Sequence, residues 1–125
     1  MRLFGAMMIA LSAINGCWGA DGKGDFFIGG GVGGVKCPQF LNALATVRQH
    51  GGPGGLEGAK IVSPFLAYVH GFQTGYNSEA DGVYDIFHAL GENAGIDVLY
   101  AIEPWCAKNP DKAFATGLLV ISRIL

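Results

Sequence analysis

Charge is scarce in this sequence, and the scarcity excludes one class of partner. Charged side chains make up 14% of the 125 residues, against about a quarter in ordinary soluble domains. The eight basic residues are scattered along the chain rather than clustered. Nucleic-acid binding depends on clustered Lys and Arg that neutralise phosphates. We therefore expect no nucleic-acid partner.

Motifs for catalysis and for metal binding are missing as well. The three histidines, His50, His70 and His88, stand in no H-E-x-x-H or similar ligand spacing. No serine lies in G-x-S-x-G, and no serine or cysteine has a recognisable base partner. Gly29 to Gly34 match G-x-G-x-x-G, but a dinucleotide site needs a surrounding β-α-β unit, which this pattern lacks. We predict a protein that is not an enzyme and has no catalytic residue, metal or cofactor.

The chain has no hydrophobic run long enough for a transmembrane helix, but its N-terminus carries a short one. Arg2 is followed by an uncharged run over residues 3–14 and then by small residues. This pattern is typical of a secretory signal peptide, and the run is too short to span a bilayer permanently. Cleavage after Ala20 predicts a signal peptide over residues 1–20.

A second interpretation of the N-terminus remains open. The stretch "INGC" resembles a bacterial lipoprotein cleavage box, which would remove residues 1–16 and leave Cys17 lipidated. In that form the protein would touch a membrane only through its lipid anchor. Both interpretations place the protein outside the cytosol, in the periplasm of a Gram-negative bacterium or secreted, either free or anchored through Cys17.

Export changes what the cysteines mean, because an oxidising compartment turns spare thiols into bridges. Apart from Cys17, the chain contains only Cys37 and Cys106. Their pairing predicts a disulfide that stabilises the fold by roughly 4 kcal/mol. The alternative is a nucleophilic or metal-binding thiol, but neither cysteine lies in C-x-x-C or near a histidine at ligand spacing.

The remaining pattern predicts an all-α fold, a small four-helix domain over residues 37–125. The glycine-rich residues 21–36 predict an extended or mobile tether in front of it. The first helix follows Pro38 and stops at His50 before two glycines. The second covers residues 56–76, with Pro64 expected to kink or restart it.

Two further helices complete the predicted domain. The third begins with Asp97 as its N-cap and runs to Lys108, with a kink expected at Pro104. The fourth begins with Asn109 as its cap. Its predicted buried stripe consists of Phe114, Leu118, Ile121 and Leu125.

Two stretches, "KCPQFL" and "PWCAKNPDKAF", resemble the HdeA/HdeB family of small periplasmic acid-stress chaperones. The similar features are a cysteine that opens the first helix, a Cys-x-x-Asn-Pro junction into the last helix, and one disulfide that joins the two. The matching residues are Cys37, Phe40, Leu41, Cys106, Asn109 and Pro110. The segment "YVHGFQTGYN" is more distantly similar to Tai-type immunity proteins, which block amidase toxins in the periplasm.

The resemblance implies an exported binding protein whose partner is another protein. The first hypothesis is an acid-stress holdase chaperone that binds unfolded clients and can form a homodimer. The alternatives are an immunity protein of fixed shape that binds a periplasmic toxin, and a lipoprotein of unassigned role. An aromatic stripe consists of Phe65, Tyr68, Phe72 and Tyr76. Its first interpretation is a core face, and its functional interpretation is a protein-binding surface, because the polar tips of the tyrosines suit an interface that also meets water.

The chaperone hypothesis needs a response to acid. Without residues 1–20 the chain has seven basic and ten acidic side chains, a net charge of −3 with His neutral, and full protonation takes it to +10. Self-repulsion would then loosen the fold or a dimer and expose apolar helix faces, while the disulfide limits unfolding. The predicted pH-switch residues are Asp81, Asp85, Glu92, Asp97 and Glu103.

Overall fold

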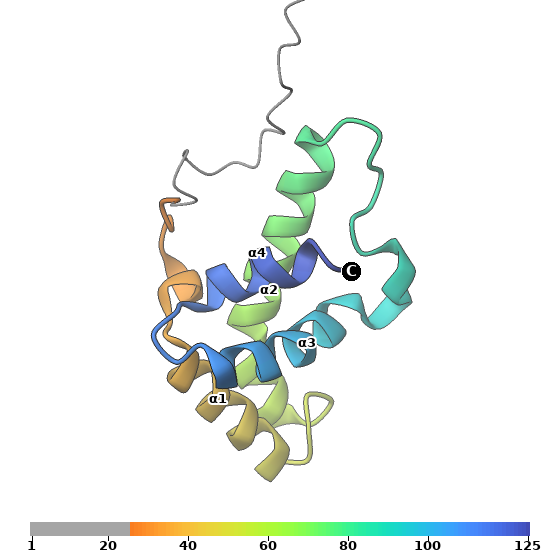
Figure 1. The fold of residues 1–125 in the computed structure, drawn as a ribbon. Coiled ribbons are helices and arrows are strands. Elements are labelled where there is room, and N and C mark those ends of the chain that lie inside the picture. Colours follow the sequence, from red (N-terminus) through yellow and green to blue (C-terminus); the bar gives the residue numbers. More distant parts are fainter. Residues whose placement is uncertain (1–25) are drawn as a thin grey trace, which may run out of the picture.

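The computed structural model describes residues 26–125, and these residues form an all-α domain, as predicted (Figure 1). No strand occurs among them, and one isolated antiparallel bridge pairs Lys36 with Ala113. The predicted signal peptide and Cys17 lie outside the described residues. The elements are the 3₁₀ segments η1 (Gly31–Gly34) and η2 (His88–Asn93) and the helices α1 (Cys37–Gln49), α2 (Leu56–Glu79), α3 (Ala94–Lys108) and α4 (Phe114–Ser122).

The first helix, α1, has the predicted limits. Pro38 lies in its first turn, where a missing N–H costs nothing, and the backbone N–H of Lys36 donates to Oε1 of Gln39 at 3.3 Å. At the other end, Gly51 adopts a φ of 83°, and the N–H of Gly52 donates to the carbonyl of Val47 at 2.9 Å. This left-handed closing turn ends the helix, since few residues other than glycine adopt it.

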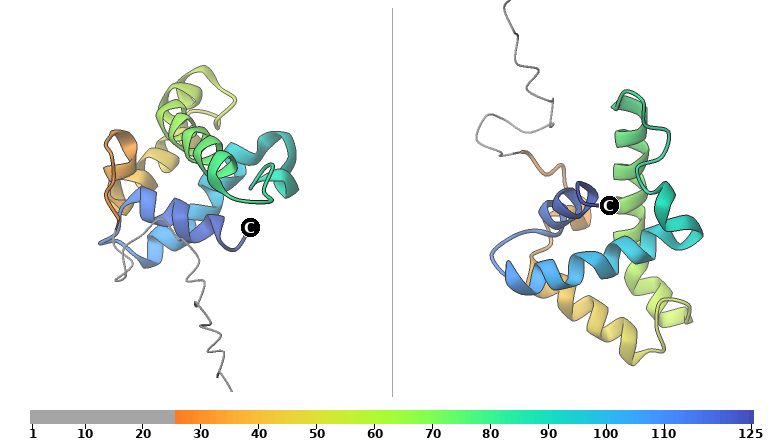
Figure 2. Two further views of the ribbon diagram at one scale, coloured as in Figure 1. Left: turned by 90° about the horizontal axis from the view of Figure 1, so that it is seen from above. Right: turned by 45° about the vertical axis from the view of Figure 1, so that its right-hand side comes forward.

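The second helix, α2, is the longest element. It runs unbroken through Pro64, so the predicted restart does not occur. Its C-terminal part projects beyond the other helices in two views of the molecule (Figures 1 and 2). Within residues 26–125, no helix combines the length and the apolar character that a membrane span needs.

The predicted N-cap of the third helix, Asp97, is wrong by four residues. The helix α3 begins at Ala94 after Asn93, and Asp97 lies exposed in its first turn. Packing explains the earlier start, because Ala94 and Gly95 are buried, and a Cβ on Gly95 would lie 2.9 Å from Nε2 of His70 on α2. The helix ends at Lys108, as predicted, and it contains Pro104.

The fourth helix, in contrast, begins later than predicted. The side-chain amide of Asn109 donates to the carbonyl of Trp105 at 2.8 Å, so this residue closes α3 instead of opening α4. The chain then pairs with residues 35–37: Cys37 N–H donates to Lys112 O at 2.9 Å, and Phe114 N–H donates to Val35 O at 2.8 Å. Because these bonds hold residues 112–114 against another segment, α4 starts only at Phe114.

The buried stripe of α4 is shorter than predicted. Phe114, Leu118 and Ile121 are buried, but Leu125 lies beyond the helix end and is 48% exposed. Phe114 joins Phe40 of α1 and Phe65 of α2 in an aromatic cluster whose ring centroids lie 4.9 to 5.3 Å apart. Three helices thus meet at this cluster, which forms the centre of the core.

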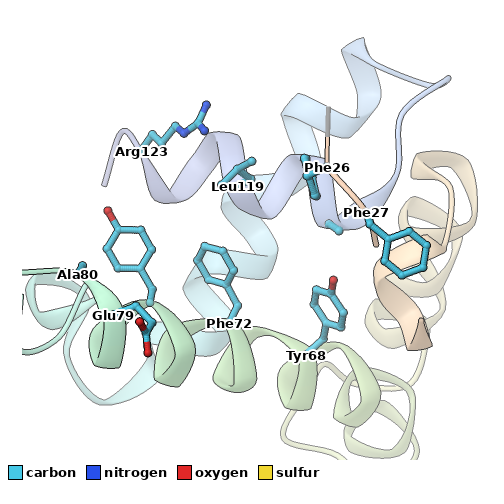
Figure 3. A pocket seen from close by; sticks show the side chains of 10 residues that line it. Phe26, Phe27, Tyr68, Phe72, Glu79, Ala80, Leu119 and Arg123 are labelled. Carbon is cyan, nitrogen blue, oxygen red and sulfur yellow. The ribbon is translucent and has the colours of Figure 1, made fainter. Parts of the chain in front are cut away.

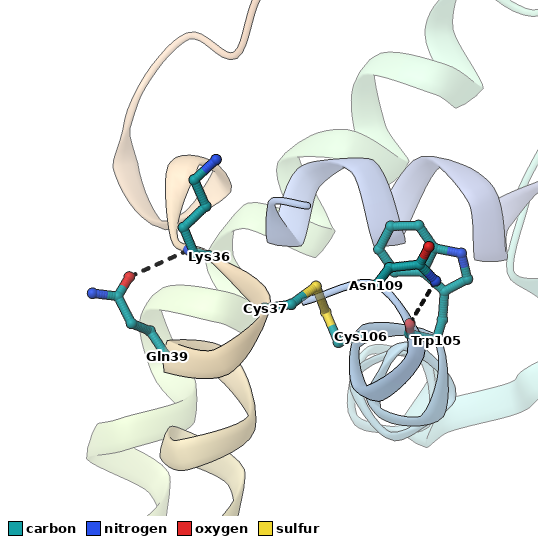
Figure 4. Close-up of a disulfide and its surroundings, with 6 residues drawn as sticks. All are labelled: Lys36, Cys37, Gln39, Trp105, Cys106 and Asn109. Atoms are coloured by element: carbon teal, nitrogen blue, oxygen red, sulfur yellow. Dashed lines mark hydrogen bonds between the residues drawn. A yellow bond between two sulfur atoms is a disulfide. The ribbon is translucent and has the colours of Figure 1, made fainter. Parts of the chain in front are cut away.

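The predicted disulfide between Cys37 and Cys106 is present, and it joins the start of α1 to the end of α3 (Figure 4). The two Cα atoms lie 4.9 Å apart, and neither residue is exposed to solvent. The bridge lies beside the segment 35–37, which pairs with the chain before α4. One covalent bond therefore fixes the place where α1, α3 and α4 meet.

The prediction of a mobile tether is wrong for residues 31–36. Gly31–Gly34 form the 3₁₀ segment η1, and Val32 and Val35 pack against the core. Gly33 lies so close to the ring of Tyr68 that a Cβ would collide with the hydroxyl group. This part of the glycine-rich segment is therefore folded onto α2 and α4, and its glycines permit the close approach.

Candidate functional site

An apolar groove lies between α2 and α4. It has a volume of about 390 Å³, which is within the usual range for ligand sites of about 300–1,000 Å³. Its lining residues are Phe26, Phe27, Tyr68, Phe72, Tyr76, Glu79, Ala80, Ala115, Leu119 and Arg123. Figure 3 shows Phe26 and Phe27 at one end, Glu79, Ala80 and Arg123 at the other, and Phe72 between them.

The aromatic stripe of α2 supplies one wall of this groove. Tyr68, Phe72 and Tyr76 recur at the spacing that places side chains on one helix face. Phe65, the fourth residue of the predicted binding surface, instead lies in the core with its ring centroid 5.1 Å from that of Phe114. The stripe thus divides into a core part and a surface part, and the surface part lines the groove.

The opposite wall is provided by α4. Leu119 and Ala115 face the groove, whereas Leu118 and Ile121 of the same helix belong to the core. The two helices meet at the base of α4, where the ring centroids of Tyr68 and Phe114 lie 5.9 Å apart. Leu119 is partly buried and is not among the residues packed against the core, so it is available to a ligand.

The sequence predicts only about half of the side chains that line this groove. Aromatic periodicity predicts the contribution of α2. Phe26 and Phe27, in contrast, fall in the predicted tether, and no pattern in the sequence assigns a role to Leu119 or Arg123. The two adjacent phenylalanines beside the glycine run could have indicated that this segment packs on the domain, because aromatic side chains favour buried positions. The α4 residues could be assigned only once the limits of that helix were known.

A polar cluster at the projecting end of α2 fastens the loop that follows it. The Asp85 carboxylate accepts hydrogen bonds from the Gln73 side chain at 2.7 Å, the Phe87 backbone at 3.0 Å and the Asn77 side chain at 3.4 Å. In turn, the Asn77 side-chain carbonyl accepts from the Ile86 N–H at 2.8 Å. The Asp85 carboxylate therefore contributes to the attachment of the loop to α2, together with the hydrogen bond between Ile86 and Asn77.

These hydrogen bonds hold the pKa of Asp85 below its usual value. The Gln73 amide has the largest effect and the backbone N–H of Phe87 comes next, while partial burial opposes both and nearby His88 adds a small effect in the same direction. The attachment brings Phe87, which is 1% exposed, and the partly buried Ile86 onto the core.

A second acidic residue links α3 to α1. Glu103 forms a two-point ion pair with Arg48, with N–O distances of 2.5 and 2.6 Å. The guanidinium hydrogen bonds lower the pKa of Glu103, against the opposing effect of burial. Arg48 also lies over the ring of Tyr100, 5.2 Å from its centroid. The pair is partly exposed, so it contributes modestly to stability.

The five predicted switch residues are spread over the domain and form no cluster. Asp85 and Glu103 fasten neighbouring elements, whereas Asp81, Glu92 and Asp97 are exposed. No group of three or more His, Cys, Asp or Glu side chains within residues 26–125 could hold a metal ion.

Comparisons with known proteins found no matching family model, no matching curated protein and no matching solved structure.

Proposed function

We propose that this protein is a small exported holdase, which binds apolar segments of other proteins in the groove between α2 and α4 and binds them more strongly in acid. The observation that carries the proposal is the groove itself. Its walls are aromatic and aliphatic, and it stays open above a core that is already filled by other side chains. Apolar side chains gain about 25 cal/mol per Å² when they leave water for such a surface.

The chemistry of the lining favours a peptide segment as the ligand. Phe72 and Leu119 provide apolar contact, while the hydroxyl groups of Tyr68 and Tyr76 can meet the polar backbone of a bound chain. Glu79 and Arg123 give one end of the groove both signs of charge. This combination of an apolar centre and a polar margin is typical of protein interfaces.

Acid would open a second apolar area. The folded-state pKa of Asp85 lies below its unfolded value of about 4, so its hydrogen bonds stabilise the fold above that pH. Their contribution is lost as the pH falls through the folded pKa. The same sign applies to Glu103. Release of the loop would uncover Phe87 and Ile86, which pack in and against the core.

The disulfide limits how far this opening can go. It holds the start of α1 against the end of α3, away from the Asp85 loop. Repulsion among the positive charges of the acidified chain would act on the loop and on the projecting end of α2 first, because neither is cross-linked. Partial opening with a retained core is the state that a holdase requires.

The test measures aggregation of a client protein by light scattering at pH 2.5 and at pH 7. Wild type is compared with the groove variant Tyr76→Ser/Leu119→Ser, in which neither substitution touches the core. The matched control is Leu56→Ser/Tyr84→Ser, because Leu56 is 74% and Tyr84 is 96% exposed and neither lines the groove. Wild type and control should suppress aggregation at pH 2.5, and the groove variant should not.

Two results would contradict the proposal. Absence of protection at pH 2.5 by any of the three proteins would reject the holdase function. Equal protection by the groove variant and wild type would place client binding elsewhere. Groove-dependent capture of one partner with equal affinity at both pH values would instead favour a binding protein of fixed shape, such as an immunity protein.

A further inference from the structure

The groove is already partly occupied by the protein's own chain. We call Phe26, Phe27 and Ile28 the aromatic arm. Phe26 and Phe27 line the groove at the end near Tyr68 (Figure 3). Phe26 is partly buried there, whereas Phe27 is 92% exposed.

Within residues 26–125, the arm is held in place by side-chain contacts. No hydrogen bond joins the backbone of Phe26, Phe27 or Ile28 to any other part of residues 26–125. The nearest hydrogen-bonded element after the arm is η1, which begins at Gly31. The arm can therefore leave the groove without breaking a backbone hydrogen bond.

A glycine hinge separates the arm from a fixed base. Gly30 and Gly31 have φ values of 121° and 63°, which strain other residues, and no neighbouring atom lies within 4 Å of a Cβ built on either. Immediately beyond the hinge, Val32 packs on the core and Gly33 lies against Tyr68. Gly31 already belongs to η1, so a change in the direction of the arm would occur at Gly29 or Gly30, directly before a base that is fixed beside the groove.

We infer that the aromatic arm is a built-in competitor for the groove, and that the groove accepts in its place extended segments with adjacent aromatic side chains. The inference rests on the proposed function and names its ligand class. In the structure, the arm places one partly buried aromatic side chain, Phe26, at the end of the groove near Tyr68. The remaining space beside Phe72 and Leu119 is apolar and open, so a longer segment makes contacts that the arm does not.

Competition of this kind lowers the apparent affinity for any other ligand. When the arm fills the groove in a fraction of molecules, the apparent Kd rises by the inverse of the remaining fraction. An arm seated in about 80–90% of molecules weakens binding by about fivefold to tenfold. Replacing the seated side chain should therefore lower the apparent Kd by the same factor.

The experiment uses a fluorescent peptide with the sequence of residues 24–30, GDFFIGG, and measures its Kd by anisotropy at pH 7. The exported protein is compared with Phe26→Ser and Phe27→Ser. Phe26→Ser should bind the peptide about fivefold to tenfold more tightly than wild type. Phe27→Ser should have a smaller effect, because that side chain is already 92% exposed. The peptide GDSSIGG should not bind.

Control variants test whether the peptide binds in the groove. Leu119→Ser should weaken peptide binding in wild type and in Phe26→Ser, since Leu119 lines the groove. Tyr84→Ser, an aromatic-to-serine change outside the groove, should leave the Kd unchanged. Thermal unfolding of each variant checks that the fold is retained.

Equal Kd values for wild type and Phe26→Ser would overturn the inference, as would an unchanged Kd in Leu119→Ser or an absence of binding in every variant. Failure of the proposed function gives a different result. A protein that binds the peptide in an arm-dependent way at pH 7 but protects no client at pH 2.5 loses only the holdase proposal. A protein that protects clients but shows no effect of the arm loses only this inference.

Discussion

Removal of the Cys37–Cys106 disulfide should cost this domain a large share of its stability. The bridge joins residues 69 positions apart, and both cysteines are fully buried where α1 meets α3. We expect the variant Cys37→Ala/Cys106→Ala to fold less stably but to keep its helices, because the aromatic cluster of Phe40, Phe65 and Phe114 does not depend on the bridge.

The magnitude follows from the length of the closed loop. Loop-closure entropy for a loop of this length corresponds to about 4 kcal/mol at 25 °C. Domains of this size have unfolding free energies of about 5–15 kcal/mol in total. In a domain of about 100 residues, each kcal/mol shifts the Tm by about 4–8 °C, so the expected fall is roughly 15–30 °C.

The assay is urea unfolding at pH 7, followed by far-UV circular dichroism, for the oxidised wild type, the two single alanine variants and the double variant. Replacing either cysteine removes the cross-link from the unfolded chain, just as replacing both does. All three variants should therefore lose about 4 kcal/mol of unfolding free energy relative to wild type. A loss below about 1 kcal/mol would refute the loop-entropy account of the stability of this fold.

Three further predictions concern single positions. The substitution Gly117→Leu should destabilise the fold by about 1–3 kcal/mol in urea unfolding, because a Cβ there already lies 2.9 Å from Ile102 Cγ2 and 3.0 Å from Trp105 Cε3; an unchanged midpoint would contradict this packing. Gly71→Ala, at an exposed position of α2 with no atom within 4 Å of the added Cβ, should stabilise by about 0.5–1 kcal/mol, and a lower Tm would show that the position is not open. Asp85→Asn should lower the free energy of unfolding at pH 7. Because the folded pKa of Asp85 is depressed, the variant should also lose less stability than wild type as the pH falls below about 4. Parallel profiles of stability against pH for the two proteins would show that Asp85 is not linked to folding.

Local signals in the sequence were sufficient where the structure depends on local chemistry. Pro38 marks the start of α1, and the pair Gly51 and Gly52 marks its end, because each residue favours a backbone conformation that only one end of a helix requires. The disulfide followed from counting, since Cys37 and Cys106 are the only cysteines beyond the predicted leader.

Contacts between distant segments decided the features that were predicted wrongly. Asn109 and Pro110 form a good local signal for a helix start, but the pairing of residues 112–114 with residues 35–37 delays α4 to Phe114. The glycine-rich segment shows the same effect. Its composition indicates mobility, yet Gly33 permits a close contact with Tyr68 that no other residue would allow.

The site itself was only half predictable for the same reason. Periodicity places Tyr68, Phe72 and Tyr76 on one face of α2, but it does not say which of the aromatic residues on that face the core will use. Phe65 becomes a core residue because Phe114 reaches it from α4. The other wall of the groove, including Leu119, depends on where α4 begins and on its angle to α2, and neither is encoded locally.

The most direct test of the central claim, that the groove holds a client, is site-specific photo-cross-linking. A photoreactive phenylalanine analogue is placed at Tyr76, on the exposed rim of the groove, or at Leu56, which is 74% exposed and outside both the groove and the Asp85 loop. Each protein is irradiated with an aggregation-prone client at pH 2.5 and at pH 7. We predict cross-links from position 76 that are stronger at pH 2.5, with few or none from position 56. Equal cross-linking from both positions, or none from position 76, would contradict the account.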